Sequence, residues 1–281
     1  MNVTITGASG FVGRALSEHL RASGHSVTAI SLRTQPPTEV FAGCQAVVNL
    51  AGEPVVQRWT AAARERISNS RIQGTRSLVA ALRKHPPAVL VSASAVGYYG
   101  SRGGEVLTEN SPPSSDFLGQ LALEWEREAH AAEQFGVRLV TPRIGVALGP
   151  SGGALAKMLL PFRLGVGGRL GTGKQWMSWI ALDDLVSLIE FAIADAALSG
   201  PVNAVAPNPV TNAVFTRELA AALHRPAIFP VPAFALKILF GEISGVLLGG
   251  QRVIPQAALR AGFRFRFAEL GEALRAALSH T

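Results

Sequence analysis

The chain has 281 residues, of which 48% are hydrophobic and 16% are charged. This composition supplies a core for one large domain, or for one domain with a smaller lobe, and it excludes a disordered chain. The net charge of +7 comes mostly from arginines without a dense basic run, so we expect no nucleic-acid partner and attribute part of the charge to an anionic cofactor.

The single cysteine, Cys44, excludes an intrachain disulfide and fits a reducing compartment. The chain begins directly with a predicted strand, without the pattern of a signal peptide. Its most apolar late run, residues 233–250, is broken by Lys237, Glu242 and glycines, which predicts two packed amphipathic helices and no membrane span. We therefore expect a cytoplasmic protein with no membrane partner.

Residues 1–24 predict a strand, a glycine turn and a helix. Val3 and Ile5 alternate with polar residues, and an amphipathic run follows the turn. This is the opening unit of a dinucleotide-binding fold, in which glycines permit a tight turn, a close approach to pyrophosphate and close helix packing. The alternative is an ordinary glycine-rich turn. The candidate cofactor-binding residues here are Gly7, Ser9, Gly10, Phe11, Val12 and Gly13.

The second predicted strand, residues 25–32, ends without a carboxylate. Ser31, Leu32 and Arg33 follow where an acidic residue would bind the ribose hydroxyls of NAD. An arginine at this position can bind the 2′-phosphate of NADP(H). The sequence therefore favours NADP(H), with Arg33 as the phosphate contact. A solvated loop arginine is the alternative. Residues 35–45 are too short for a full crossover helix.

The third predicted strand, residues 46–52, is a continuous apolar run typical of a buried parallel strand. Ala51 and Gly52 at its end would let a dinucleotide lie against the backbone. A helix over residues 60–84 carries Arg71, which either reaches the cofactor phosphates or is solvated.

The fourth predicted strand, residues 88–93, places Ser92 and Ser94 at its carboxyl end. Hydroxyls at this edge would lie beside the nicotinamide and bond a substrate carbonyl or alcohol. The strand over residues 137–144 brings Pro142 near the cofactor.

Further elements follow along the chain. A helix over residues 116–135 is expected to bury Trp125 and to leave Glu126 in solvent. We expect helices over residues 154–164, 183–195 and 212–224, and strands over 175–180 and 201–206. Residues 165–173, rich in glycine, are expected to form a mobile loop or a short hairpin over a site. At least one of Asp183 and Asp184 is interpreted as a helix cap. Residues 230–278 are expected to be helical with a strand-like insert at 262–267, and no metal-ligand cluster is found.

Together these segments resemble the extended short-chain dehydrogenase/reductase superfamily, and more closely an atypical "epimerase family" branch with its own C-terminal domain of unknown function. The resemblance covers nearly the whole chain. It rests on residues 7–13, 49–54, 58–59, 70–72, 98–100, 152–168 and 250–256. It implies NADP(H) with its pyrophosphate at the glycine turn, Arg33 near the 2′-phosphate, Leu50 and Ala51 along the adenosine, Arg71 as a further contact, and Ser94 as the active-site serine.

One departure concerns catalysis. The superfamily pairs a tyrosine with a lysine one helical turn later, and the lysine lowers the pKa of the tyrosine so that its phenol exchanges a proton. The matching helix, residues 116–125, has neither residue. The only tyrosines, Tyr98 and Tyr99, either substitute for the missing one or are packing residues.

The sequence thus predicts an α/β fold, a Rossmann-like doubly wound parallel sheet with a smaller, mainly helical C-terminal lobe. Residues 1–229 form the NADP(H)-binding domain, with a substrate-lobe insertion at about 150–180, and residues 230–281 form the C-terminal domain. The expected function is that of an NADP(H)-binding oxidoreductase or epimerase-like enzyme acting on a small nucleotide-sugar or carbonyl substrate. The alternative is a non-catalytic NADP(H)-binding regulator. A homodimer is left open.

Overall fold

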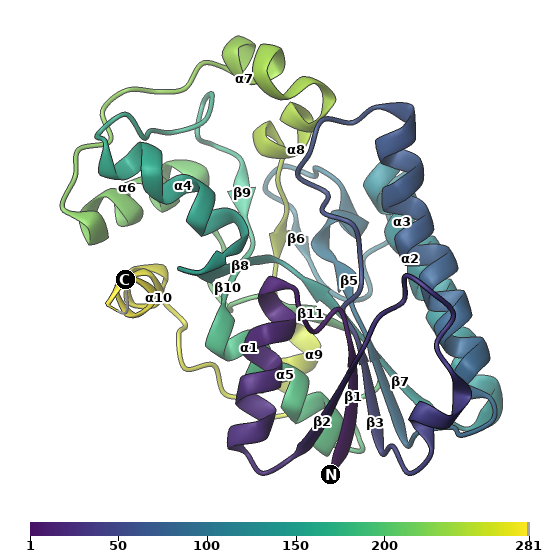
Figure 1. Cartoon of the computed structure of the whole chain (residues 1–281). Coiled ribbons are helices and arrows are strands. Elements are labelled where there is room, and N and C mark those ends of the chain that lie inside the picture. Colours follow the sequence, from purple (N-terminus) through teal and green to yellow (C-terminus); the bar gives the residue numbers. More distant parts are fainter. Residues whose placement is uncertain (280–281) are drawn as a thin grey trace.

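A computed structural model describes residues 1–279 of the chain. Its centre is a parallel sheet (Figure 1) in which a short seventh strand, β5 (Ser94–Ala95), runs beside β7 beyond the end of β4. The other six strands are, in spatial order, β11 (Gly200–Ala204), β7 (Arg138–Ile144), β4 (Val89–Ser92), β3 (Ala46–Asn49), β1 (Asn2–Thr6) and β2 (Ser26–Ile30). The sheet is the Rossmann-like one expected from the sequence.

Helices cover both faces of this sheet. On one face, α1 (Phe11–Ala22) packs beside α5 (Leu182–Ala194), and on the other α2 (Ala61–Leu82) packs beside α3 (Phe117–His130). Because successive strand residues point to opposite faces, each strand divides its apolar side chains between two cores. In β3, Val48 joins the core beneath α1 and α5, whereas Val47 joins the core beneath α2.

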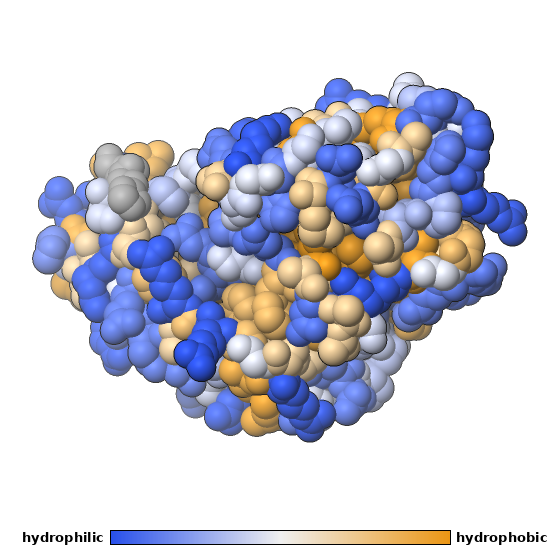
Figure 2. Space-filling model, turned by 90° about the horizontal axis from the view of Figure 1, so that it is seen from below, coloured by the Kyte–Doolittle hydropathy of each residue, from blue (hydrophilic) through white to orange (hydrophobic). Residues whose placement is uncertain are grey.

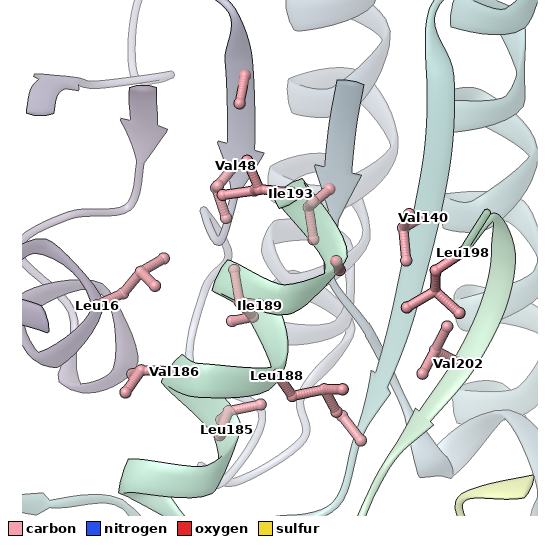
Figure 3. Close-up of a cluster of buried hydrophobic side chains, with 14 of the residues drawn as sticks. Leu16, Val48, Val140, Leu185, Val186, Leu188, Ile189, Ile193, Leu198 and Val202 are labelled. Atoms are coloured by element: carbon pink, nitrogen blue, oxygen red, sulfur yellow. The ribbon is translucent and has the colours of Figure 1, made fainter. Parts of the chain in front are cut away.

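The core beneath α1 and α5 is built mainly by α5. Its leucine, valine and isoleucine side chains point toward the sheet and toward Leu16 of α1 (Figure 3). Leu16, Leu185 and Val48 are completely buried. The apolar side chains of α1 and α5 therefore pack against one face of the sheet.

The connection between β2 and β3 contains only one short 3₁₀ helix, η1 (Thr38–Phe41). The prediction of an abbreviated crossover is confirmed. The connection leaves the end of β2 exposed, with Arg33 at the surface.

A second lobe lies beyond the carboxyl ends of the strands and to one side of them (Figure 1). Its core surrounds Trp179, Leu155 and Phe215. The lobe contains α4 (Gly153–Arg163), α6 (Asn212–Leu223), α7 (Ala233–Phe240), η4 (Gly241–Ile243), α8 (Ser244–Leu248) and α10 (Leu270–Leu278), whereas α9 (Gln256–Arg260) packs beside β11.

Three two-stranded ladders connect the lobe to the sheet region. They are β8 (Val146–Gly149) with β10 (Trp179–Ala181), β9 (Trp176–Met177) with β12 (Val210–Thr211), and β6 (Val106–Leu107) with β13 (Arg252–Val253). Two 3₁₀ helices, η2 (Val96–Tyr99) and η3 (Ala131–Phe135), complete the described elements.

Two expectations about the C-terminal half are wrong. Residues 262–267 form no strand, and the strand within residues 230–278 is β13 instead. Neither aspartate at the start of α5 caps that helix. Asp184 is buried and accepts hydrogen bonds from the backbone N–H groups of Arg266 (2.8 Å) and Phe267 (3.0 Å), so its carboxylate replaces the strand partner that this segment lacks.

The face at the amino ends of the strands is largely hydrophilic, with apolar side chains interspersed near its middle (Figure 2). Across residues 1–279, none of the helices has the length and apolar character that crossing a membrane requires.

Candidate functional site

The glycine turn between β1 and α1 is closed by backbone contacts that leave no room for side chains. Gly7 has φ of +69°, and a Cβ atom on it would lie 2.7 Å from the carbonyl carbon of Leu50. A Cβ atom on Gly13 would lie 2.2 Å from the carbonyl oxygen of Gly7. No side chain caps α1 at Gly10, so the N–H groups of its first turn remain available to an anion. Ser9 and Gly10 are exposed here, beside the half-buried Phe11 and Val12.

Arg71 lies against the exit of β3. Its guanidinium packs so closely on Gly52 that a Cβ atom there would be 3.1 Å from its central carbon. Arg71 donates to the carbonyl oxygen of Glu53 at 2.9 Å and stacks over the ring of Trp125. Burial lowers the pKa of Arg71 to about 10, which leaves it charged at neutral pH. A half-buried cation therefore lies beside Leu50, Ala51 and Gly52.

The end of β2 offers a cation and no free carboxylate. The guanidinium of Arg33 is exposed and forms no ion pair within residues 1–279. Glu39, the first carboxylate after β2, is bound 2.7 Å from Lys84 Nζ. The hydrogen bond from Lys84 lowers the pKa of Glu39 to about 2. An added phosphate would thus meet a positive rather than a negative side chain.

Ser92 is part of a buried polar network beneath the edge of the sheet. Asn49 accepts a hydrogen bond from Thr6 Oγ1 (2.7 Å) and donates to Ser92 Oγ (3.2 Å) and to Thr75 Oγ1 (3.0 Å). Trp125 Nε1 also donates a hydrogen bond to Thr75 Oγ1. Ser92 is therefore a buried residue beneath the carboxyl edge of the sheet. Pro142, within β7, is also buried.

Ser94 belongs to a second buried network, centred on an ion pair that the sequence did not predict. Its hydroxyl donates to Glu126 at 2.6 Å, and Arg143 Nε and Nη2 each bind Glu126 at 2.8 Å. Burial alone would lower the pKa of Arg143, but the hydrogen bonds to Glu126 outweigh it and raise that pKa. The expectation that Glu126 is solvated is wrong, because α3 turns it toward β7.

The two tyrosines after Ser94 have different environments. Tyr99 is completely buried, donates to Asn203 Oδ1 (2.6 Å) and accepts from Arg143 Nη1 (2.9 Å). Burial raises its pKa to about 12. The Tyr98 ring stacks on Arg143 at 3.5 Å, and its hydroxyl has no hydrogen-bond partner within residues 1–279. Of the two tyrosines, Tyr98 is therefore the one whose hydroxyl is free, among residues 1–279, to bind a ligand.

The network also holds the C-terminal half in place. Glu109 accepts from the backbone N–H groups of Asn203 and Ala257, each at 3.0 Å, and Asn203 donates to the carbonyl oxygen of Ile254. Sequence reasoning missed Glu109 and Asn203, and it missed the pairing of Glu126 with Arg143. The available signal was Arg143 itself, because an arginine within an apolar strand requires a buried carboxylate.

A groove of about 810 Å³ lies elsewhere, between α1 and α5. It is lined by Phe11, Arg14, His19 and Asp183 among others, but by neither Ser94 nor Tyr98. Among residues 1–279 there is no group of His, Cys, Asp and Glu side chains that could hold a metal ion.

The chain is similar to known proteins over almost its full length. The sequence model of the NAD dependent epimerase/dehydratase family matches residues 3–205, and that of a domain of unknown function, DUF1731, matches residues 231–277. The chloroplastic SDR39U1 homolog of Arabidopsis thaliana, an epimerase family protein, is 41% identical over 300 residues, which cover 98% of this chain and 86% of the relative. An epimerase family protein of Mycobacterium bovis is 43% identical over 288 residues, covering 97% and 96%.

A solved structure agrees with both matches. The crystal structure of human epimerase family protein SDR39U1 with NADPH superposes with a TM-score of 0.92 at 36% identity and covers 100% of both chains. The resemblance indicated by the sequence motifs is confirmed. The chain belongs to the NAD dependent epimerase/dehydratase family, in its extended short-chain dehydrogenase branch.

Proposed function

We propose that this protein binds NADP(H) at the carboxyl edge of its sheet. The observation that carries the proposal is the glycine turn, which packs so tightly that Cβ atoms on Gly7 and Gly13 would collide with backbone, and which leads into a first turn of α1 that no side chain caps. Arg71 beside Gly52 supports a phosphate contact, and Arg33 supports a contact with the 2′-phosphate. NADPH in the human relative supports the same choice of cofactor.

Titration of NADPH and NADH against Arg33→Ala tests this assignment. Because a charge-assisted hydrogen bond contributes about 1.5–3 kcal/mol, the Kd for NADPH should rise at least about tenfold while that for NADH stays nearly constant. Arg83→Ala, at an exposed arginine where α2 ends, is the matched control. Equal losses for both cofactors would remove Arg33 from the phosphate site.

We further propose that the cofactor is used in oxidoreduction or epimerisation of a small nucleotide-sugar or carbonyl substrate. The cofactor supplies hydride exchange when bound. Tyr98 would exchange the proton with the substrate oxygen, since its hydroxyl is free and that of Tyr99 is bound at both sides. The Ser94 hydroxyl already donates its hydrogen bond to Glu126. Its oxygen lone pairs remain, so Ser94 would accept a hydrogen bond from a substrate hydroxyl.

A panel of nucleotide sugars and simple carbonyl compounds tests the catalytic role. NADPH absorbance reports net reduction, and chromatography of the products reports epimerisation, which regenerates the cofactor and leaves the absorbance unchanged. Tyr98→Phe should lower kcat at least about 100-fold and leave the Kd for NADPH unchanged. Tyr99→Phe should mainly lower stability, because it removes a partner of Asn203 and Arg143. Unchanged turnover in Tyr98→Phe would contradict the proton-transfer role.

A second function, non-catalytic NADP(H) binding with a regulatory role, is favoured by one observation. In α3, the helix that matches the superfamily's catalytic helix, residues 117–130 contain neither tyrosine nor lysine. Saturable NADPH binding without turnover of any compound in the panel is the result expected for this alternative.

A further inference from the structure

Two segments of the second lobe form one outer surface. They are residues 151–175, which include α4 and the loop after it, and residues 219–241, which include the end of α6 and all of α7. The backbone joins them, because Val231 N donates to the carbonyl oxygen of Arg169 and Gly171 N donates to that of Val231, each at 2.8 Å. In Figure 1 the two segments lie together at the end of the molecule beyond the sheet. We name them the apolar-basic surface.

This surface exposes apolar side chains that soluble proteins normally bury. Fourteen large hydrophobic side chains are exposed within residues 1–279, and nine of them belong to these two segments. In α7, Phe234 is 67% and Ile238 77% exposed, so the helix presents apolar side chains outward. The other seven are Leu160, Leu164, Val166, Ile228, Phe229, Leu239 and Phe240.

The same segments carry most of the net charge of the protein. They contain six of the 26 Lys and Arg residues and none of the 19 Asp and Glu residues, so they supply six of the seven net positive charges. All six side chains are exposed, and none forms an ion pair within the described part of the chain. These residues are Lys157, Arg163, Arg169, Lys174, Arg225 and Lys237. The two segments are thus basic, with no carboxylate of their own.

The positive charge and the exposed apolar side chains of this surface together indicate which kind of partner it binds. A second copy would bring like charges together across a symmetric contact, which costs free energy. Nucleic acid would match the charge, but six of the nine exposed apolar side chains are aliphatic and do not stack on bases as aromatic ones do. A bilayer containing anionic lipids matches both properties, since acyl chains accept the apolar side chains and headgroups bind the cations.

We propose that the apolar-basic surface binds the surface of an anionic lipid bilayer. Phe234, Ile238 and Leu239 enter the boundary between headgroups and acyl chains, with α7 lying in the plane of the membrane. Lys237 and its basic neighbours bind phosphate headgroups through long side chains. The sequence alone led us to expect no membrane partner, and an interfacial contact of this kind requires no spanning helix.

Co-sedimentation of the full chain with vesicles tests the proposal. Vesicles of phosphatidylcholine with about one-third phosphatidylglycerol should sediment the protein, and pure phosphatidylcholine should not. High salt should weaken the association. Phe234→Ser with Ile238→Ser should abolish sedimentation, and Arg163→Glu with Arg169→Glu should lower the partition coefficient at least about tenfold, because each cation contributes about fivefold near an anionic surface.

Matched changes away from this surface serve as controls. Leu259→Ser removes an exposed apolar side chain of α9, and Arg83→Glu with Arg260→Glu makes the same change in charge. Both should keep wild-type sedimentation, and NADPH binding by every variant reports that the fold is intact.

Three results would overturn the proposal. They are no sedimentation with anionic vesicles, equal sedimentation with neutral ones, and sedimentation that the Phe234 and Ile238 changes leave intact. Sedimentation velocity without lipid adds a fourth. A wild-type dimer that becomes a monomer in Phe234→Ser with Ile238→Ser would assign the surface to self-association.

Discussion

At the scale of single residues, Gly7 has two constraints that a matched glycine separates. Gly7 and Gly24 both have φ in the left-handed region, at +69° and +81°. A Cβ atom on Gly24 would meet nothing within 4 Å, whereas one on Gly7 would collide with Leu50 and Ala51. Gly24→Ala should therefore cost only the conformational penalty of about 1–2 kcal/mol.

Gly7→Ala should cost that penalty plus about 1–3 kcal/mol of overpacking, and it should also weaken NADPH binding because the turn must shift. Urea unfolding measures the first effect, and NADPH titration of the same two variants measures the second. Equal behaviour of Gly7→Ala and Gly24→Ala would mean that the contact with Leu50 has no role in shaping the site.

The ion pair between Glu126 and Arg143 is the second residue-scale feature with a measurable consequence. Both side chains are buried, and breaking such a pair leaves an uncompensated charge. Arg143→Leu should lower the free energy of unfolding by about 3–5 kcal/mol, measured in urea. Adding Glu126→Leu removes the orphaned carboxylate and should restore part of the loss. A double variant less stable than Arg143→Leu alone would contradict this account.

At the scale of elements, the sequence predicted most helices and strands because their apolar periods are clear. The apolar run of β3 and the helices around it illustrate this. The wrong predictions concern segments whose structure depends on a side chain that is distant in sequence. Residues 262–267 alternate like a strand, but Asp184 holds their backbone from α5. Within the candidate site, the glycine turn was evident locally, whereas Glu126 was not, because only tertiary packing brings α3 against β7.

One contact between elements predicts a pH dependence. Glu190 of α5 lies 2.6 Å from His19 Nε2 of α1 and 3.2 Å from His25 Nε2 just beyond that helix. Burial alone would raise the pKa of the Glu190 carboxyl. Hydrogen bonds from Ser23 and His19 outweigh burial and lower this pKa below its unfolded value. A lowered carboxyl pKa gives stability that is present above the unfolded pKa of about 4.3 and is lost as pH falls through the folded pKa.

Glu190→Gln removes this contribution. Wild type should be more stable than Glu190→Gln at pH 6, and the difference should shrink steadily as pH falls below about 4. Guanidinium unfolding at several pH values measures it. Glu18→Gln, at an exposed carboxylate of the same helix as His19, controls for the general effect of acid. A difference that stays constant with pH would exclude titration of Glu190 as its origin.

At the scale of the whole molecule, the network around Arg143 ties β5, β7 and α3 to the C-terminal half through Glu109 and Asn203. The cofactor edge and the second lobe therefore share one set of buried contacts. A ligand at the glycine turn should consequently stabilise the entire chain against unfolding rather than one half of it, so that a single transition shifts.

NADPH at about 100 times its Kd should add about 2.7 kcal/mol of stability, which for a chain of this size raises Tm by about 5 °C. NADH at the same concentration should raise Tm less, since Arg33 would meet no 2′-phosphate. In Arg33→Ala the two cofactors should give nearly equal shifts, because the phosphate contact is gone. Differential scanning fluorimetry with both cofactors measures these shifts. A larger shift with NADH than with NADPH in wild type would mean that the exposed end of β2 does not select the cofactor.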